Sequence, residues 1–89
     1  MYVIVHHKVE DYAKWRSVFD EHAEVRKNAG ATGNNRVFQS VDDPNAMTIV
    51  LEWESTEKAK QFAESDELKA AMQKAGTIGK PDIHFADEV

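Results

Sequence analysis

The order of strand-like and helix-like segments limits the fold of this chain more than any other feature. The clearest segment is residues 47–54, where apolar side chains alternate with mostly polar ones, as in a strand with one buried face. β-branched and aromatic residues predict three further strands, and apolar residues with a helical period predict two helices. In chain order the predicted elements are a strand (2–8), a helix (11–29), two strands (35–41 and 47–54), a helix (about 56–75) and a strand (82–86).

This order is that of the ferredoxin-like fold. Each strand–helix–strand half crosses over with a right-handed connection, which places both helices on one face of the sheet. We therefore predict an α+β fold with one four-stranded sheet and two helices, formed by residues 1–89 as a single domain. Gly30 and Gly76 suit the ends of the two helices. Ser65 predicts a break or kink in the second helix, because serine is a favourable N-cap residue.

Composition and charge argue against several classes of function. The formal net charge is −5, with acidic and basic residues interspersed, which disfavours a nucleic-acid partner. The chain has no cysteine, so disulfides and thiolate metal sites are excluded. No apolar run approaches the roughly 20 residues of a membrane span, so no membrane partner is expected. The first residues form a strand pattern and lack the features of a signal peptide, which favours a cytoplasmic location.

The chain is short for a stable monomer. A domain of 89 residues buries only about 60–65% of the surface that its unfolded chain exposes. Apolar residues occur at both strand parities, as Val3, Ile4 and Val50 show, so both faces of the sheet need cover. The helices cover only one of them. We therefore predict a homodimer in which two subunits meet through the other sheet face.

The first predicted helix carries two polar side chains on its apolar stripe. At about 100° per residue, Trp15, His22 and Arg26 fall within about 40° of one another, in the same arc as Phe19. His22 and Arg26 are one turn apart, so their side chains are neighbours. Two explanations are open. They are either a satisfied core histidine with an arginine that reaches past the helix end, or a polar pair that serves chemistry.

The catalytic explanation has a mechanism. A guanidinium beside an imidazole disfavours the charged imidazole, which would keep His22 a neutral base. Arg26 would then stabilise negative charge that develops on a carbonyl or enolate oxygen.

His7 is a third polar candidate. His6 and His7 are adjacent on a strand and therefore point to opposite faces. His7 shares its parity with Val5 and is predicted to face the helices, although a histidine at the end of a strand is an equally good explanation. The two histidines cannot ligate one metal ion, and no His or Glu spacing typical of a metal site is present, so no metal is expected.

Three stretches resemble small dimeric α/β-barrel proteins of the antibiotic biosynthesis monooxygenase group and their cyclase-like relatives: HKVEDYAKWRSVFDEHAEVRKNAG, VDDPN and EWESTEKAKQFAESDELKAAMQKAG. The resemblance covers nearly the whole chain. It implies two ferredoxin-like subunits whose sheets stack face to face, with a pocket between sheet and helices in each. It does not select a reaction, because the group includes cofactor-independent oxygenation, haem degradation, aldol-type cyclisation and isomerisation. The second helix lacks the histidine of haem-degrading members, and no cofactor is expected.

Two hypotheses about function follow. The first is an enzyme that acts on a small apolar or aromatic molecule, by cofactor-independent oxygenation or by acid–base rearrangement such as cyclisation. The second is a non-catalytic, ligand-binding or stress-related dimer. Both need a small, largely apolar pocket between sheet and helices. Its predicted lining is Trp15, Phe19, Leu51, Trp53, Phe62 and Met72, with His22, Arg26 and His7 as the polar members.

Overall fold

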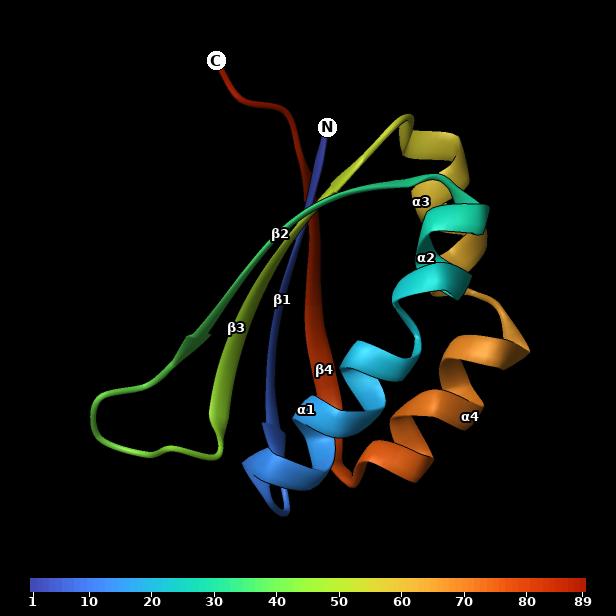
Figure 1. The fold of residues 1–89 in the computed structure, drawn as a ribbon. Coiled ribbons are helices and arrows are strands. Elements are labelled where there is room, and N and C mark those ends of the chain that lie inside the picture. The colour runs from blue at the N-terminus through green and yellow to red at the C-terminus, as the bar shows by residue number, and fades with distance from the viewer.

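The computed structural model describes residues 1–89 and contains one antiparallel sheet with helices on a single face (Figure 1). The strands are β1 (Tyr2–Val9), β2 (Ala31–Gln39), β3 (Ala46–Trp53) and β4 (Thr77–Ala86), in the order β2-β3-β1-β4. The helices are α1 (Tyr12–Glu21), α2 (Ala23–Ala29), α3 (Thr56–Ala63) and α4 (Asp66–Ala75). This is the ferredoxin-like α+β fold that the order of elements predicts, with each predicted helix divided into two.

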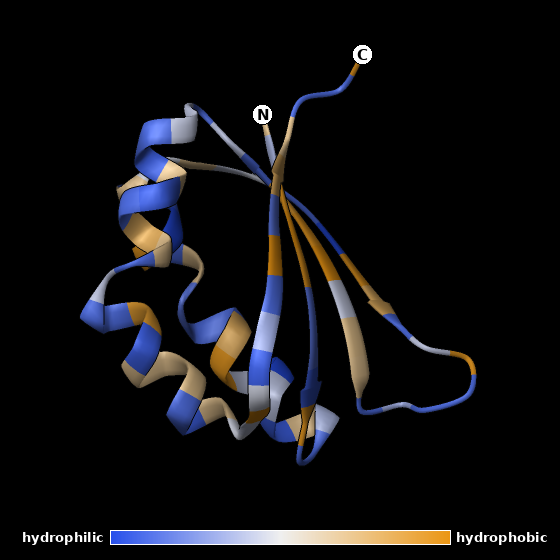
Figure 2. Ribbon diagram, turned by 180° about the vertical axis from the view of Figure 1, so that it is seen from behind, coloured by the Kyte–Doolittle hydropathy of each residue, from blue (hydrophilic) through white to orange (hydrophobic).

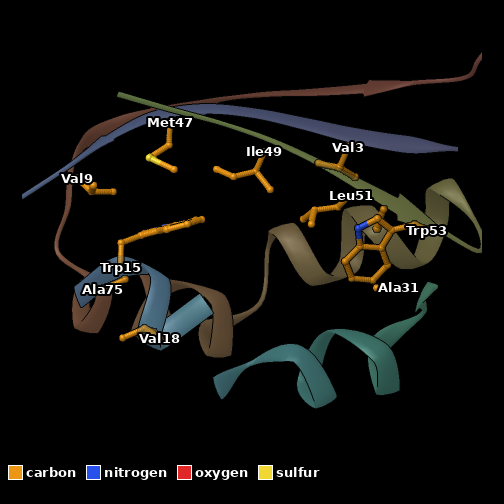
Figure 3. Close-up of a cluster of buried hydrophobic side chains, with 11 residues drawn as sticks. Val3, Val9, Trp15, Val18, Ala31, Met47, Ile49, Leu51, Trp53 and Ala75 are labelled. Carbon is orange, nitrogen blue, oxygen red and sulfur yellow. The ribbon is translucent and has the colours of Figure 1, made fainter. Parts of the chain in front are cut away.

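Alternation along β3 decides which side chains form the core. Its buried residues alternate with partly buried ones, and the buried ones are Met47, Ile49, Leu51 and Trp53. We call the face on which they lie the inner face, because the helices cover it. Val3 of β1 pairs with Leu51 and lies on the same face. Figure 3 shows Met47 and Ile49 near Trp15 of α1, and Trp53 at the other end of the core, where its ring packs against Phe62 of α3. Burial of this apolar surface holds the helices on the sheet.

Serine side chains begin both halves of the second helical segment. Ser55 Oγ accepts a hydrogen bond from the Lys58 backbone N–H at 3.2 Å. Ser65 Oγ accepts one from the Leu68 backbone N–H, also at 3.2 Å. Each serine satisfies an N–H group that has no partner within its helix. The break predicted at Ser65 is therefore confirmed.

The single helix predicted for residues 11–29 is wrong, because the chain breaks at His22. The Val18 carbonyl accepts both the backbone N–H and the Nδ1–H of His22, at 3.1 and 3.0 Å. Arg26 reaches back across the break and donates from Nη1 to the Phe19 carbonyl at 2.8 Å. Side chains thus bond the carbonyl groups in the last turn of α1, where the regular helical pattern ends.

Two strands begin earlier than predicted. β2 starts at Ala31 instead of residue 35, and β4 starts at Thr77 instead of residue 82. Each early part contains a glycine with positive φ, Gly33 at 90° and Gly79 at 70°, within a shift in strand register. Irregular strands of this kind lose the simple alternation of apolar and polar residues. The sequence pattern therefore reveals only their regular ends.

The other face of the sheet, which we call the outer face, has no covering element in the chain (Figures 1 and 2). Ile4 and Val50 pair with each other near its centre and are partly buried. Phe38 of β2 lies on the same face and is 45% exposed. Exposed apolar surface of this kind is typical of association surfaces in proteins. None of the helices has both the length and the apolar character needed to cross a membrane.

Candidate functional site between the sheet and the helices

A cavity of about 120 Å³ lies between the inner face of the sheet and the helices. Sixteen of its twenty lining residues are hydrophobic, and the other four are His7, His22, Arg26 and Thr77. Every site residue predicted from the sequence lines this cavity: Trp15, Phe19, Leu51, Trp53, Phe62, Met72, His7, His22 and Arg26. The structure therefore brings the candidates from β1, β3 and the helices together around one space. Their chemical roles remain predictions.

Arg26 is the most unusual of the polar residues. Its side chain is 6% exposed, although it forms no salt bridge. Nη1 donates to the Phe19 carbonyl, and the guanidinium carbon lies 3.8 Å from the centroid of the Phe19 ring. Nε has no hydrogen-bond partner. Burial lowers the pKa of the Arg26 guanidinium from its usual value, but an arginine keeps its proton in proteins. The cavity therefore contains a cation without a counter-ion.

His22 lies at the junction of α1 and α2 and is partly buried. A backbone carbonyl only accepts, so the contact between Nδ1 and the Val18 carbonyl assigns the proton to Nδ1. Nε2 takes no part in this contact. His22 bonds the Val18 carbonyl of α1, and Arg26 bonds the Phe19 carbonyl of the same helix. Both explanations left open by the sequence thus have support, because the two side chains line the cavity and also complete the helix end.

His7 faces the helices and packs against Trp15 of α1. Its ring meets the Trp15 ring edge to face, with the centroids 5.8 Å apart. Neither imidazole nitrogen has a hydrogen-bond partner. Burial lowers the pKa of His7 from its ordinary value of 6.5, because the charged ring is poorly solvated there. His7 is therefore neutral at pH 7, with one nitrogen able to accept a proton.

Two further polar groups at the cavity have no partner. Trp53 is 3% exposed, and its Nε1 donates no hydrogen bond. Thr77 Oγ1 is also unpaired. Thr77 is absent from the residues predicted from sequence, because β4 was expected to begin five residues later. A signal for it exists in the β-branched pair Thr77 and Ile78 directly after Gly76, the glycine that ends α4.

The polar atoms in this apolar space define what the cavity is able to do. Buried polar groups without partners are unfavourable, and native proteins generally pair them with protein, water or ligand. No Asp or Glu is present among the lining residues. The arrangement combines a neutral base, His7, with a buried cation, Arg26, in a space of low polarity. Such a site is suited to remove a proton from an organic molecule and to stabilise the anion that results.

The fold and its cavity define a ferredoxin-like α+β protein with an interior space between sheet and helices. The family model for antibiotic biosynthesis monooxygenases matches residues 5–74. The chain therefore belongs to the antibiotic biosynthesis monooxygenase family. No curated protein matches the chain.

Solved structures share this fold over nearly the full chain. A Bordetella bronchiseptica protein that carries the family's name has a TM-score of 0.82 at 17% identity, covering 99% of this chain and 95% of that one. A Caulobacter crescentus protein of the same description has a TM-score of 0.74 at 24% identity, covering 99% and 88%. SnoaB from Streptomyces nogalater, a cofactor-independent oxygenase, has a TM-score of 0.73 at 13% identity, covering 99% and 93%. At these identities the likeness establishes the fold alone.

Proposed function

We propose that this protein is a cytoplasmic, cofactor-independent monooxygenase that acts on a small organic molecule within the inner cavity. One observation carries the proposal: a neutral histidine and a buried cation without a counter-ion line the same apolar space. Family membership and the structural similarity to SnoaB, a cofactor-independent oxygenase, support it.

The chemistry requires the substrate itself to supply the electrons. The base removes a proton from an acidic O–H or C–H group. Arg26 stabilises the negative charge that conjugation carries to an oxygen at the other end of the substrate. Molecular oxygen then adds at an electron-rich carbon that bears a hydrogen, which gives a hydroperoxide after protonation. Loss of water from the hydroperoxide leaves a carbonyl group. One oxygen atom of molecular oxygen enters the product and the other leaves as water. Each of the two atoms accepts two electrons, and the substrate supplies all of them.

His7 is the best candidate for the base. Both of its nitrogens are free of protein partners, and its lowered pKa keeps the ring neutral at pH 7. His22 is the second candidate, through Nε2, since its Nδ1–H is engaged by Val18. The catalytic residues of the proposal are therefore His7, His22 and Arg26. The apolar lining would orient the ring of the substrate and exclude water.

Oxygen uptake tests the proposal, with adjacent histidines as a matched pair. Hydroquinone is a suitable single-ring probe, and the assay contains a chelator and no flavin, nicotinamide or metal. We expect uptake above the protein-free rate, and a fall of at least about a hundredfold in His7→Gln, as expected for loss of a general base. His6→Gln changes the exposed neighbour on the outer face and should retain the rate. If hydroquinone binds but oxygen uptake stays at the protein-free rate, the oxygenase proposal is wrong.

We also propose that the protein works as a homodimer through the outer face. Ile4 and Val50 form the apolar floor of a groove on this face. Arg36 on the edge strand β2 borders the groove, and Asp87 and Glu88 border it after β4, the opposite edge strand. A two-fold axis parallel to the strands stacks β2 of one subunit over β4 of the other. Arg36 of each subunit then lies over β4 of its partner, toward the strand end that leads to Asp87 and Glu88, and the contact is self-complementary.

Sedimentation equilibrium at micromolar concentration measures this assembly. The proposal predicts the mass of two chains. A mass of one chain over the whole concentration range would contradict it.

A non-catalytic role is the second candidate function. It is favoured by the bonds of His22 and Arg26 to carbonyl groups of α1, because these explain both side chains as parts of the helix junction. In that case the protein binds a small ligand without changing it. Ligand binding without oxygen uptake or other turnover is the expected result.

A further inference from the structure

We infer that the cavity binds a single-ring organic anion. This ligand has a carboxylate or other oxyanion at one end and a hydroxyl or carbonyl oxygen at the other. The inference rests on the proposed binding role of the cavity but not on its oxygen chemistry. Unpaired polar atoms at two separate places in an otherwise apolar lining point to this class of ligand.

The first place, the donor pole, consists of Arg26 Nε and Trp53 Nε1. Both side chains are more than nine-tenths buried, with exposures of 6% and 3%, and neither atom has a partner. The backbones that carry them are close, because Ala31, which pairs with Trp53, directly follows Gly30, whose N–H bonds the Arg26 carbonyl at 3.1 Å. The proposal places both atoms at this end of the cavity.

The chemistry of the donor pole selects an anion. Guanidinium and indole groups only donate hydrogen bonds, so a partner common to both must accept. Arg26 has a positive charge that no Asp or Glu of the lining balances. An oxyanion satisfies both requirements, and a hydrogen bond between charged partners is stronger than one between neutral groups.

The second place, the mixed pole, consists of His7 and Thr77. Thr77 pairs with Val9, and His7 lies two residues before Val9 on the same face of β1. His7 also pairs with Met47, which Figure 3 shows at the opposite end of the core from Trp53. A neutral imidazole and a hydroxyl both donate and accept. The mixed pole therefore suits an uncharged hydroxyl or carbonyl oxygen.

An aromatic wall joins the two poles. The His7 ring meets Trp15, and Trp15 stacks on Phe19 with the centroids 4.9 Å apart and the planes at 21°. The Arg26 guanidinium lies against the Phe19 ring and ends this row of rings. A flat ring that lies along the wall gains aromatic contacts and places its substituents at the poles. The volume of about 120 Å³ is close to the roughly 150 Å³ of an apolar cavity that accepts benzene, which limits the ligand to about one ring.

Tryptophan fluorescence measures binding directly, because the two tryptophans of the chain, Trp15 and Trp53, both line the cavity. Three probes separate the features of the ligand. These are 4-hydroxybenzoate, with both polar ends, benzoate, which lacks the hydroxyl, and 6-hydroxy-2-naphthoate, which has both ends on two rings. We expect 4-hydroxybenzoate to bind about fivefold more tightly than benzoate, the effect of one additional hydrogen bond. The naphthoate should bind at least tenfold more weakly than 4-hydroxybenzoate.

Two variants assign the poles. Thr77→Val removes one hydroxyl at constant shape and should abolish the difference between 4-hydroxybenzoate and benzoate. Thr48→Val, the same change on the outer face, should leave it intact. Arg26→Lys keeps the charge but removes Nε and should weaken both anions by about tenfold.

The outcomes separate this inference from the proposed oxygenase activity. Equal affinities for 4-hydroxybenzoate and benzoate, no effect of Thr77→Val, or tighter binding of the naphthoate would overturn the inference, even where oxygen uptake with hydroquinone is observed. Binding in the predicted order without oxygen uptake would support the inference and refute the oxygenase.

Discussion

His6 and His7 are neighbours in the sequence and lie in opposite environments. His6 is exposed on the outer face, where its ring nitrogens are 3.2 and 3.3 Å from the Thr48 hydroxyl. His7 lies on the inner face against Trp15, with both nitrogens buried and unpaired. The same residue type therefore serves a solvated surface on one side of β1 and an apolar cavity on the other.

The difference between the two faces shows where binding energy is available. On the outer face His6 lies within hydrogen-bond distance of the Thr48 hydroxyl, and no side-chain nitrogen or oxygen atom of that face is buried without a partner. Four side chains that line the inner cavity retain unpaired polar atoms, and these are His7, Arg26, Trp53 and Thr77. Such atoms are unfavourable for folding and favourable for a ligand that pairs with them. This difference supports the proposals of small-molecule binding at the inner face and subunit association at the outer face.

The largest expected effect is a loss of folding stability, which tests whether the inner face forms the hydrophobic core. Met47 is 1% exposed, and Met47→Ala should lower the free energy of unfolding by about 2–5 kcal/mol, through lost apolar burial and the cavity left behind. Thr48→Ala, one residue further on the outer face, should cost about 0.5 kcal/mol or less. Chemical denaturation measures both. Equal losses would contradict the assignment of the two faces.

A smaller effect is expected for association at the outer face. Val50→Lys places a charge in the apolar floor of the groove, beside Ile4. The dimer should dissociate about a hundredfold more readily, because a buried unpaired charge is costly. Sedimentation velocity over a dilution series measures the change, and Val41→Lys in the exposed β2–β3 loop provides a charge-matched control. Unchanged association of Val50→Lys would place the interface elsewhere.

The smallest effect concerns pH. The pKa of His7 is lowered in the folded protein by burial, so the unfolded state takes up the proton first as the pH falls. The contribution of His7 to stability is complete above its ordinary pKa of 6.5 and declines below that value. His7→Gln should flatten this part of the stability–pH curve, and His6→Gln should not. Denaturation midpoints between pH 5 and pH 8, roughly the range in which histidine titrates, provide the measurement. Identical curves for wild type and His7→Gln would show that His7 is not buried as described.

The sequence predicts those elements whose signals are local. The alternation along β3, the capping serine at residue 65 and the order of strands and helices lead directly to the observed fold. The nine predicted site residues line one cavity for the same reason, since the apolar period of a helix and the parity of a strand determine which face a side chain occupies.

The remaining features depend on contacts that no local pattern encodes. At the break at His22, Arg26 bonds a carbonyl of the preceding turn, and a helical stripe alone gives no sign of this bond. The early start of β4, and with it Thr77, depends on an irregular pairing with β1 around Gly79. The lack of a counter-ion for Arg26 becomes visible only when all the lining residues are placed together.

A crystal structure of the protein with 4-hydroxybenzoate tests the central claim most directly, since it shows which face of the sheet binds a small molecule and in which orientation. The account predicts one molecule in the inner cavity, with its carboxylate at hydrogen-bond distance from Arg26 Nε and Trp53 Nε1. Its hydroxyl should then lie beside His7 and Thr77. A ligand bound on the outer face, or an inner cavity that holds the ring in the reverse orientation, would contradict it.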